Sequence, residues 1–302
     1  MKFSVPHFLY VVVATAIMAT ACQNRSLPTG SDSAVDRLIT LAPSVTEIAF
    51  AVGLGDRVVG VGDYCQWPPE ARTKPRLGGL FNPNLEGIVD LQPQLAVLLP
   101  SENELGRQLG RLGVEVLTVR SETLLDLEET IIALSRRCGV EARGQQLVER
   151  LRKNLAPRPI AEGHTVLISV GRAPGSPSEV RVAGPGTYLD QLVTRLGATN
   201  VFADLETTYP LVNLEVILAR SPDFIFELSA VELTTEAKQA FRQDWLAFPQ
   251  IKAAEQGQVH IFDGDFTVVP GPRLPALYDA MASALQTSPT RSAPDATRQT
   301  SP

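Results

Sequence analysis

The chain has 302 residues, of which 44% are hydrophobic, and a formal net charge of −6. This length can supply two ordinary hydrophobic cores, and the dispersed positive charges argue against nucleic acid as a partner. Three histidines and three cysteines are too few and too scattered for a zinc framework. We therefore expect no resident metal ion.

The first 36 residues predict export. Lys2 precedes an apolar run at residues 8–21, which has the size of a signal-peptide core and is short for a membrane span. The run ends in Ala-Thr-Ala-Cys, a sequence similar to a bacterial lipobox with Cys22 as the lipidated residue. The alternative is an ordinary cleavage site beside a coincidental cysteine. We expect a signal peptide at 1–21 and a lipid-anchored linker at 22–36.

Strands and helices alternate over residues 37–139. The expected strands lie at 38–41, 58–62, 95–99 and 114–119, and the expected helices at 46–52, 84–91, 105–112 and 124–137. Ser44 stands where an N-cap of the first helix is expected, with Glu47 at capping-box spacing. The alternation indicates an α/β lobe with a parallel sheet.

An amphipathic segment separates the two halves of the chain. Between residues 141 and 155 one helical face carries Leu147, Val148, Leu151 and Leu155, and the other faces are charged. We interpret residues 140–161 as one long helix that joins two lobes. The alternative is a helix that packs on the first lobe only.

The second half, residues 162–285, predicts another α/β lobe. Strands are expected at 165–170, 180–183 and 259–262, with helices at 188–196, 235–245 and 275–285. A Gly/Pro/Ser turn cluster occupies 171–178. Residues 286–302 are rich in Ser, Thr and Pro and have no apolar periodicity, so we expect a disordered tail.

One motif occurs in both halves. Asn84-Leu85-Glu86 and Asn213-Leu214-Glu215 each open a short predicted helix that ends near a proline. Each Asn suits an N-cap, and each Glu is favourable in the first turn of a helix. The glutamates either serve only this purpose, or form two equivalent acidic groups that meet a partner with two halves.

Aromatic and acidic residues gather after the predicted strands. In open α/β sheets ligands bind beyond the carboxyl ends of strands, so two facing lobes would place these side chains around one cleft. Alternatively, each aromatic ring fills a gap in its own lobe. The residues are Tyr64, Trp67, Phe81, Tyr209, Asp263, Asp265 and Phe266.

Catalytic groups are not apparent in the sequence. His164 and His260 lie in or beside apolar strands, where a structural role is expected, and they form no Ser-His-Asp or Cys-His set. We therefore expect a binding protein and no enzyme. Cys65 and Cys138 either form a disulfide in an oxidising compartment or are separate buried thiols.

Several of these segments together resemble a known family. Residues 39–47 (Ile-Thr-Leu-Ala-Pro-Ser-Val-Thr-Glu), Tyr64 with Pro68-Pro69, and the two Asn-Leu-Glu motifs are similar to the helical-backbone periplasmic binding proteins of ABC importers. The resemblance covers about residues 37–285 and is strongest to the cobalamin-binding members. It implies two Rossmann-like α/β lobes with parallel sheets, joined by a single long helix, and a ligand cleft between them.

The resemblance also implies roles for individual residues. Glu86 and Glu215 match glutamates that pair with arginines of a dimeric permease. Ser44, Tyr64 and Asp265 match cleft residues, and Tyr209 stands where the cobalamin-binding members have Trp. Leu80 and Leu99 replace further tryptophans, which reduces the aromatic surface. The expected ligand-binding set is Ser44, Tyr64, Trp67, Leu80, Phe81, Tyr209, Asp265 and Phe266.

The resemblance predicts a monomeric, membrane-anchored receptor outside the cytoplasm. Its ligand would be a bulky metal chelate, either cobalamin or another corrinoid, and any metal would arrive inside the ligand without a separate cofactor. A ferric siderophore or haem is the alternative within the family. An exported enzyme or a ligand-sensing lipoprotein on the same scaffold is a more distant alternative.

Overall fold

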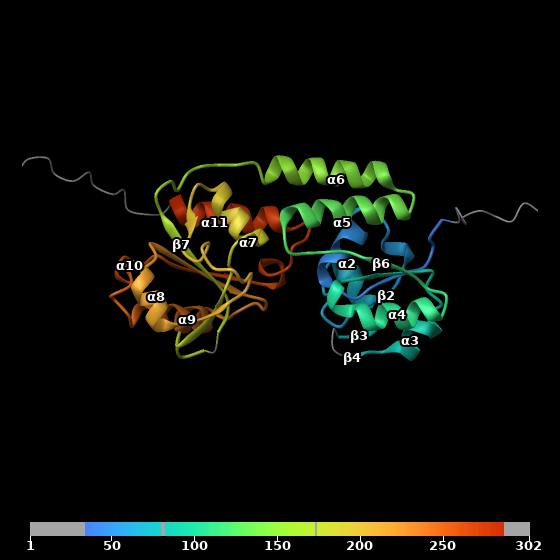
Figure 1. Cartoon of the computed structure of the whole chain (residues 1–302), viewed down its shortest axis with the longest axis horizontal. Coiled ribbons are helices and arrows are strands. Elements are labelled where there is room, and N and C mark those ends of the chain that lie inside the picture. Colours follow the sequence, from blue (N-terminus) through green and yellow to red (C-terminus); the bar gives the residue numbers. More distant parts are fainter. Residues whose placement is uncertain (1–33, 80–81, 173, 287–302) are drawn as a thin grey trace, which may run out of the picture. The chain divides into compact units, whose positions relative to one another are not determined.

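Two β-sheets, one in each half of the chain, organise the fold (Figure 1). The computed structural model describes residues 34–79, 82–172 and 174–286. From Val35 onward the chain forms one compact unit, and within it each sheet carries its own helices. The predicted α/β fold with two lobes is confirmed.

The first sheet has four parallel strands in the order β2-β1-β5-β6. Every residue of β1 and β5 is buried, as expected for strands covered on both faces. The elements of this lobe are β1 (Leu38–Thr40), α2 (Pro43–Ala51), β2 (Val58–Val61), β3 (Gly78–Gly79), β4 (Asn82–Pro83), α3 (Leu85–Asp90), β5 (Leu95–Leu98), α4 (Asn103–Arg111) and β6 (Glu115–Thr118), with 3₁₀ turns η1 (Gly55–Arg57), η2 (Pro69–Thr73) and η3 (Pro100–Glu102).

The second sheet is mixed, which corrects the expectation of a purely parallel one. Its main path is β10-β8-β7-β11-β12, and β9 pairs with β7 beside that path. β8 runs antiparallel to both β7 and β10. The reason lies in the turn cluster after β7, which is too short for the crossover that a parallel neighbour requires.

The elements of the second lobe include the predicted strands and helices close to their expected positions, together with β9, β10 and α10, which were not predicted. In chain order the elements are β7 (Thr165–Arg172), β8 (Glu179–Val182), α7 (Tyr188–Arg195), β9 (Thr199–Asn200), β10 (Leu211–Asn213), α8 (Leu214–Arg220), β11 (Phe224–Ser229), α9 (Thr235–Leu246), α10 (Lys252–Glu255), β12 (Val259–Asp263), η4 (Asp265–Thr267) and α11 (Leu274–Gln286).

Two helices occupy the chain between the sheets. α5 (Leu124–Arg137) and α6 (Glu141–Asn154) are joined by a three-residue turn and pack against each other. Ion pairs Arg136–Glu141 and Arg152–Glu128 show that they run antiparallel. Gly144 allows this close approach, because a Cβ atom at that position would lie 2.3 Å from the Ser135 hydroxyl oxygen.

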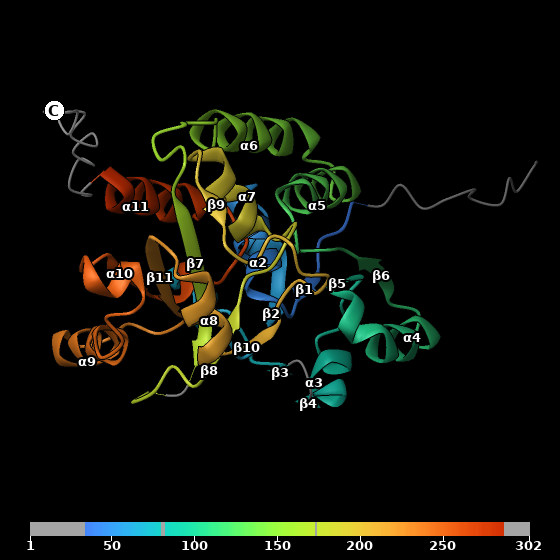
Figure 2. The same ribbon diagram turned by 60° about the vertical axis from the view of Figure 1, so that its left-hand side comes forward.

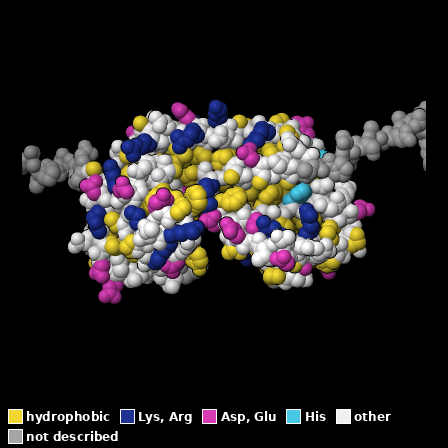
Figure 3. All heavy atoms as spheres, turned by 180° about the vertical axis from the view of Figure 1, so that it is seen from behind, with side chains coloured by type: hydrophobic (Ala, Val, Ile, Leu, Met, Phe, Trp, Pro, Cys, Tyr) yellow, Lys and Arg dark blue, Asp and Glu magenta, His cyan; other side chains and the backbone are white. Residues whose placement is uncertain are grey.

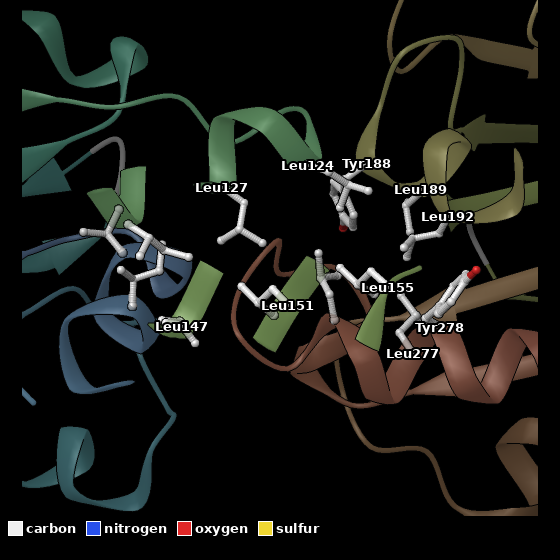
Figure 4. Packing of buried hydrophobic residues seen from close by; sticks show 14 of the residues in the cluster. Leu124, Leu127, Leu147, Leu151, Leu155, Tyr188, Leu189, Leu192, Leu277 and Tyr278 are labelled. Atoms are coloured by element: carbon white, nitrogen blue, oxygen red, sulfur yellow. The ribbon is translucent and has the colours of Figure 1, made fainter. Parts of the chain in front are cut away.

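A continuous apolar cluster connects the two lobes (Figure 4). Side chains of α5 and α6, including Leu127 and Leu151, lie between the first lobe and helices α7 and α11 of the second. The Tyr188 backbone N–H donates to the Glu122 carbonyl oxygen at 2.7 Å across this contact. Because the cluster is shared, the lobes bury apolar surface against each other as well as within themselves.

Gly144→Ala should destabilise the unit, because the added methyl group would also lie 2.6 Å from the Ser135 Cβ atom. Overpacking of this kind costs about 1–3 kcal/mol. The matched control is Gly110→Ala in α4, where a Cβ atom meets nothing within 4 Å, and which should gain up to about 1 kcal/mol of helix propensity. Urea unfolding of both variants measures the difference. Equal stability of the two variants would contradict the packing described.

Candidate functional site

The carboxyl ends of the strands of each sheet lead into the loops that carry most of the predicted site residues. The space-filling view shows a notch between the two lobes, with side chains of both charge signs at its head (Figure 3). Helices α5 and α6 lie at the end of the unit opposite to α3 and α8 in both ribbon views (Figures 1 and 2).

The first lobe contributes exposed aromatic rings after β2. Tyr64 is 74% exposed and Trp67 is 41% exposed, although both are large rings that are normally buried. The Trp67–Pro68 peptide bond is cis. Aromatic surface left open to solvent after a strand is consistent with the predicted ligand contact, and neither ring fills a gap in its own lobe.

The N-cap prediction for Ser44 is wrong. Helix α2 begins at Pro43 with Ala42 as its N-cap, and no side chain caps it. Proline is favourable at the first helical position because its missing N–H would be unsatisfied there anyway. Ser44 therefore lies inside the first turn, where it is 5% exposed, and Glu47 is free to make other contacts.

The second lobe contributes Asp265 and Phe266 from η4, directly after β12. The Thr267 hydroxyl holds this turn by donating to the Ser229 carbonyl oxygen at 2.9 Å. Asp263 lies apart from the cluster, because its carboxylate binds the Lys238 ammonium at 2.8 Å.

Arg273 brings these residues together, and sequence reasoning missed it. Its Nε donates to Glu47 Oε2 at 3.1 Å and its Nη2 to Glu47 Oε1, so the pair is bidentate. Its Nη1 donates to Asp265 Oδ1 at 2.8 Å. The guanidinium carbon lies 4.9 Å from the Trp67 ring centroid and 5.9 Å from that of Phe266. One arginine of the second lobe thus contacts an acid and an aromatic ring of the first.

The sequence marks each of the two residues as unusual but carries no signal for their pairing. Arg273 immediately precedes the final helix in the stretch Pro270-Gly271-Pro272-Arg273, and Glu47 is an acid inside an apolar helix. Glu47 was interpreted as part of a capping box, which is a local role. An ion pair between residues so far apart in the sequence has no local signature.

Burial dominates the electrostatics of the pair. Desolvation raises the pKa of the Glu47 carboxyl, and the hydrogen bonds and charge of Arg273 offset only part of that effect. For Arg273 the balance differs: desolvation lowers the pKa of the guanidinium, but the hydrogen bonds that it donates to Glu47 and Asp265, with the charges of these acids, outweigh this effect and raise the pKa. The cation therefore stays charged, and Glu47 takes up a proton at a higher pH than an ordinary glutamate.

Tyr209 packs against the apolar cluster that joins the lobes. It is half-buried beside Tyr188 and Glu122, and burial followed by the Glu122 charge raises the pKa of its hydroxyl. The same causes, together with Tyr209 itself, raise the pKa of Tyr188. Both phenols remain neutral donors at any physiological pH.

The two Asn-Leu-Glu motifs fold as predicted. The Asn84 side chain accepts from the Gly87 N–H at 2.9 Å at the start of α3, and Asn213 accepts from the Val216 N–H at 3.0 Å at the start of α8. Glu86 and Glu215 are exposed, and neither has an ion pair among the described residues. The asparagines therefore cap the helices, and the carboxylates point to solvent without an internal partner.

Three predicted residues, Leu80, Phe81 and Cys22, lie outside the described residues. Cys65 and Cys138 are both buried and free, so the disulfide alternative is wrong. Burial raises the pKa of the Cys65 thiol to about 11, which keeps it protonated and unreactive. Within the described part of the chain no group of His, Cys, Asp and Glu could hold a metal ion, and no described helix is long and apolar enough to span a membrane.

The raised pKa of Glu47 predicts a pH dependence of stability. A carboxyl whose pKa is raised on folding contributes most below its unfolded value of 4.5, and the contribution is lost as the pH rises through the folded pKa. As the pH rises from 4.5 through the folded pKa of Glu47, the free energy of unfolding of the wild type, relative to that of Glu47→Gln, should therefore fall. At higher pH the difference should stay constant. Urea unfolding at a series of pH values measures it. A difference that grows with pH would mean that the ion pair outweighs burial.

Comparisons with known proteins agree with this architecture. A family model described as periplasmic binding protein matches residues 38–265. A vitamin B12-binding protein of Vibrio cholerae is 30% identical over 79% of this chain and 84% of its own length. An uncharacterized ABC transporter substrate-binding lipoprotein of Bacillus subtilis, YvrC, is 28% identical over 79% of this chain and 76% of its own.

Solved structures show the same fold. The vitamin B12-binding protein BtuF of Vibrio cholerae superposes with a TM-score of 0.67 and 27% identity, covering 83% of this chain and 97% of its own. A periplasmic haem-binding protein of Pseudomonas aeruginosa gives a TM-score of 0.71 at 24% identity, covering 86% and 96%. With two α/β lobes and this match over most of its length, the chain belongs to the periplasmic binding protein family, whose members bind solutes and are not enzymes.

Proposed function

We propose that the protein is the substrate-binding component of an ABC importer and that it captures a corrinoid, cobalamin or a close relative. The observation that carries this proposal is the 30% identity to a vitamin B12-binding protein over 84% of that protein's length. The Bacillus subtilis relative, described as an ABC transporter substrate-binding lipoprotein, supports the transport role.

The exposed rings suit a flat, bulky ligand. Tyr64 and Trp67 of the first lobe present exposed aromatic surface, and the partly buried Phe266 of the second lobe lies on the same arginine as Trp67. Aromatic rings supply large apolar contact areas to ligands. Tyr209 offers a neutral hydroxyl. Ser44, Leu80, Phe81 and Asp265 complete the proposed ligand-binding set, in which the ligand brings its own metal.

Haem or a ferric siderophore is the second candidate. Haem-binding proteins, such as the one from Pseudomonas aeruginosa, share the fold, and a corrinoid and a haem present similar flat areas. They differ in charge at the rim, because a corrinoid carries neutral amides and haem carries carboxylates.

Glu86 and Glu215 are proposed to dock the protein on a dimeric permease. Both are exposed on N-capped helices, one in each lobe. The absence of an ion pair to either carboxylate within the described residues leaves both available to arginines, which bind carboxylates in a bidentate manner. Cys22 is proposed to carry a lipid that anchors the protein, as a monomer, to a membrane outside the cytoplasm.

Calorimetric titration should show saturable binding of cyanocobalamin or cobinamide. Tyr64→Ala should weaken this binding about fivefold or more, because the loss of an aromatic contact costs upwards of about 1 kcal/mol. Leu112→Ala, at an exposed site on the end of α4, is the control and should bind normally. Saturation by haem or a ferric siderophore alone would replace the corrinoid. No binding of any of the four would refute the receptor role.

Charge reversal at both docking sites should abolish uptake. The double variant Glu86→Lys/Glu215→Lys replaces attraction to permease arginines by repulsion, while ligand affinity should stay unchanged because neither residue is in the proposed binding set. The matched control is Glu129→Lys/Glu149→Lys, two exposed glutamates on α5 and α6. Uptake of radiolabelled ligand by cells and titration of the purified variants measure the two properties. Lost affinity, or equal loss of uptake in the control, would contradict the docking role.

A further inference from the structure

From the contacts of Arg273 we infer that this residue is a positioning residue: it fastens the two lobes to each other and fixes the distance between Trp67 and Phe266. The use of these two rings for a ligand rests on the proposed function. The fastening itself is a property of the protein without ligand.

The ion pair crosses between the lobes. Glu47 lies on α2 beside the first sheet, and Arg273 lies directly before α11 of the second lobe. The Glu47 side chain is 3% exposed and the Arg273 side chain 20%. Residue 271 also approaches closely, since a Cβ atom there would lie 2.8 Å from Glu47 Oε2. The backbone of the second lobe therefore comes within contact distance of the acid it binds.

This contact adds to the apolar one. Apolar packing and hydrogen bonds such as that from the Leu124 N–H to Gln191 Oε1 at 3.0 Å already join the lobes. The bidentate ion pair adds a directional bond between α2 and the segment before α11. Separating Glu47 from Arg273 would leave a buried carboxylate without its counter-ion, which is strongly unfavourable. The lobes are thus held against small rotations even if the ion pair adds little to net stability.

The same cation also holds one aromatic ring from each lobe. Trp67 and Phe266 both lie within about 6 Å of the guanidinium, the distance at which a cation is attracted to a ring face. Because the Arg273 guanidinium binds one acid of each lobe, its position is fixed. The two rings that contact it are therefore held at a defined distance from each other. If Arg273 no longer binds Glu47, Trp67 should be able to move relative to Phe266.

The two carboxylates on Arg273 provide a matched pair of variants. Glu47→Gln removes the negative charge that Arg273 binds on the first lobe. Asp265→Asn removes the negative charge that Arg273 binds on its own lobe, eight residues away in the sequence. In both variants an amide takes the place of a carboxylate that the Arg273 guanidinium binds. Only the first should loosen the lobes.

The experiment uses the ligand-free protein with fluorine-labelled tryptophan. The chain contains two tryptophans, Trp67 beside Arg273 and Trp245, which is fully buried in the second lobe. In Glu47→Gln and Arg273→Gln the Trp67 fluorine resonance should move and its acrylamide quenching should rise. The Trp245 resonance should stay unchanged, which shows that the second lobe remains folded. Arg273→Lys should restore the wild-type behaviour only in part, because lysine cannot bind Glu47 in a bidentate manner.

Hydrogen exchange measures the lobe motion directly. If the lobes are apart in about 1% of wild-type molecules, a variant that makes this open form ten times more populated should raise the rate of amide hydrogen exchange about tenfold. We expect this increase at residues 43–47 and 264–273 in Glu47→Gln and not in Asp265→Asn. Equal exchange in the two variants, or an unchanged Trp67 resonance in Arg273→Gln, would overturn the inference. Neither readout involves a ligand, so failure of the proposed function would leave this result unaffected.

Discussion

The two halves of this protein depend on an apolar contact that neither sheet could provide alone. Leucines of α5 and α6 pack against α7 and α11, and the buried cluster runs from the first lobe into the second without interruption. Because burial of apolar surface has no directional preference, this contact holds the lobes together without fixing their angle. Directional bonds must supply the angle.

One such bond joins the Tyr188 N–H to the Glu122 carbonyl oxygen beside the apolar cluster, and several others converge on one cation. Arg273 binds Glu47 and Asp265 and lies near Trp67 and Phe266. Burial makes the charge on Glu47 costly, so the ion pair is better understood as a source of geometric specificity than as a source of stability. The energetic cost is located where an acid of the first lobe meets a cation of the second.

The fold leaves aromatic and acidic side chains exposed on the surface. Tyr64 and Trp67 leave aromatic surface uncovered, and Glu86 and Glu215 leave two carboxylates on the surface, one in each lobe. In each case the local fold is satisfied by other groups, such as the Asn84 and Asn213 caps. Exposed side chains that the local fold does not need are available for partners, whereas Trp67 also contacts Arg273; both sets fit the proposed solute receptor.

The sequence by itself determined the elements. Alternating strands and helices, the two asparagine caps and the loop positions of Tyr64, Trp67 and Phe266 were all readable, because each depends on residues near one another in the chain. The antiparallel course of β8 and the start of α2 at Pro43 also have local causes, the short turn cluster and the proline, which the prediction misjudged. Only the tertiary structure decided the pairing of Glu47 with Arg273, because hydrophobic periodicity and capping motifs carry no information about a partner 226 residues away.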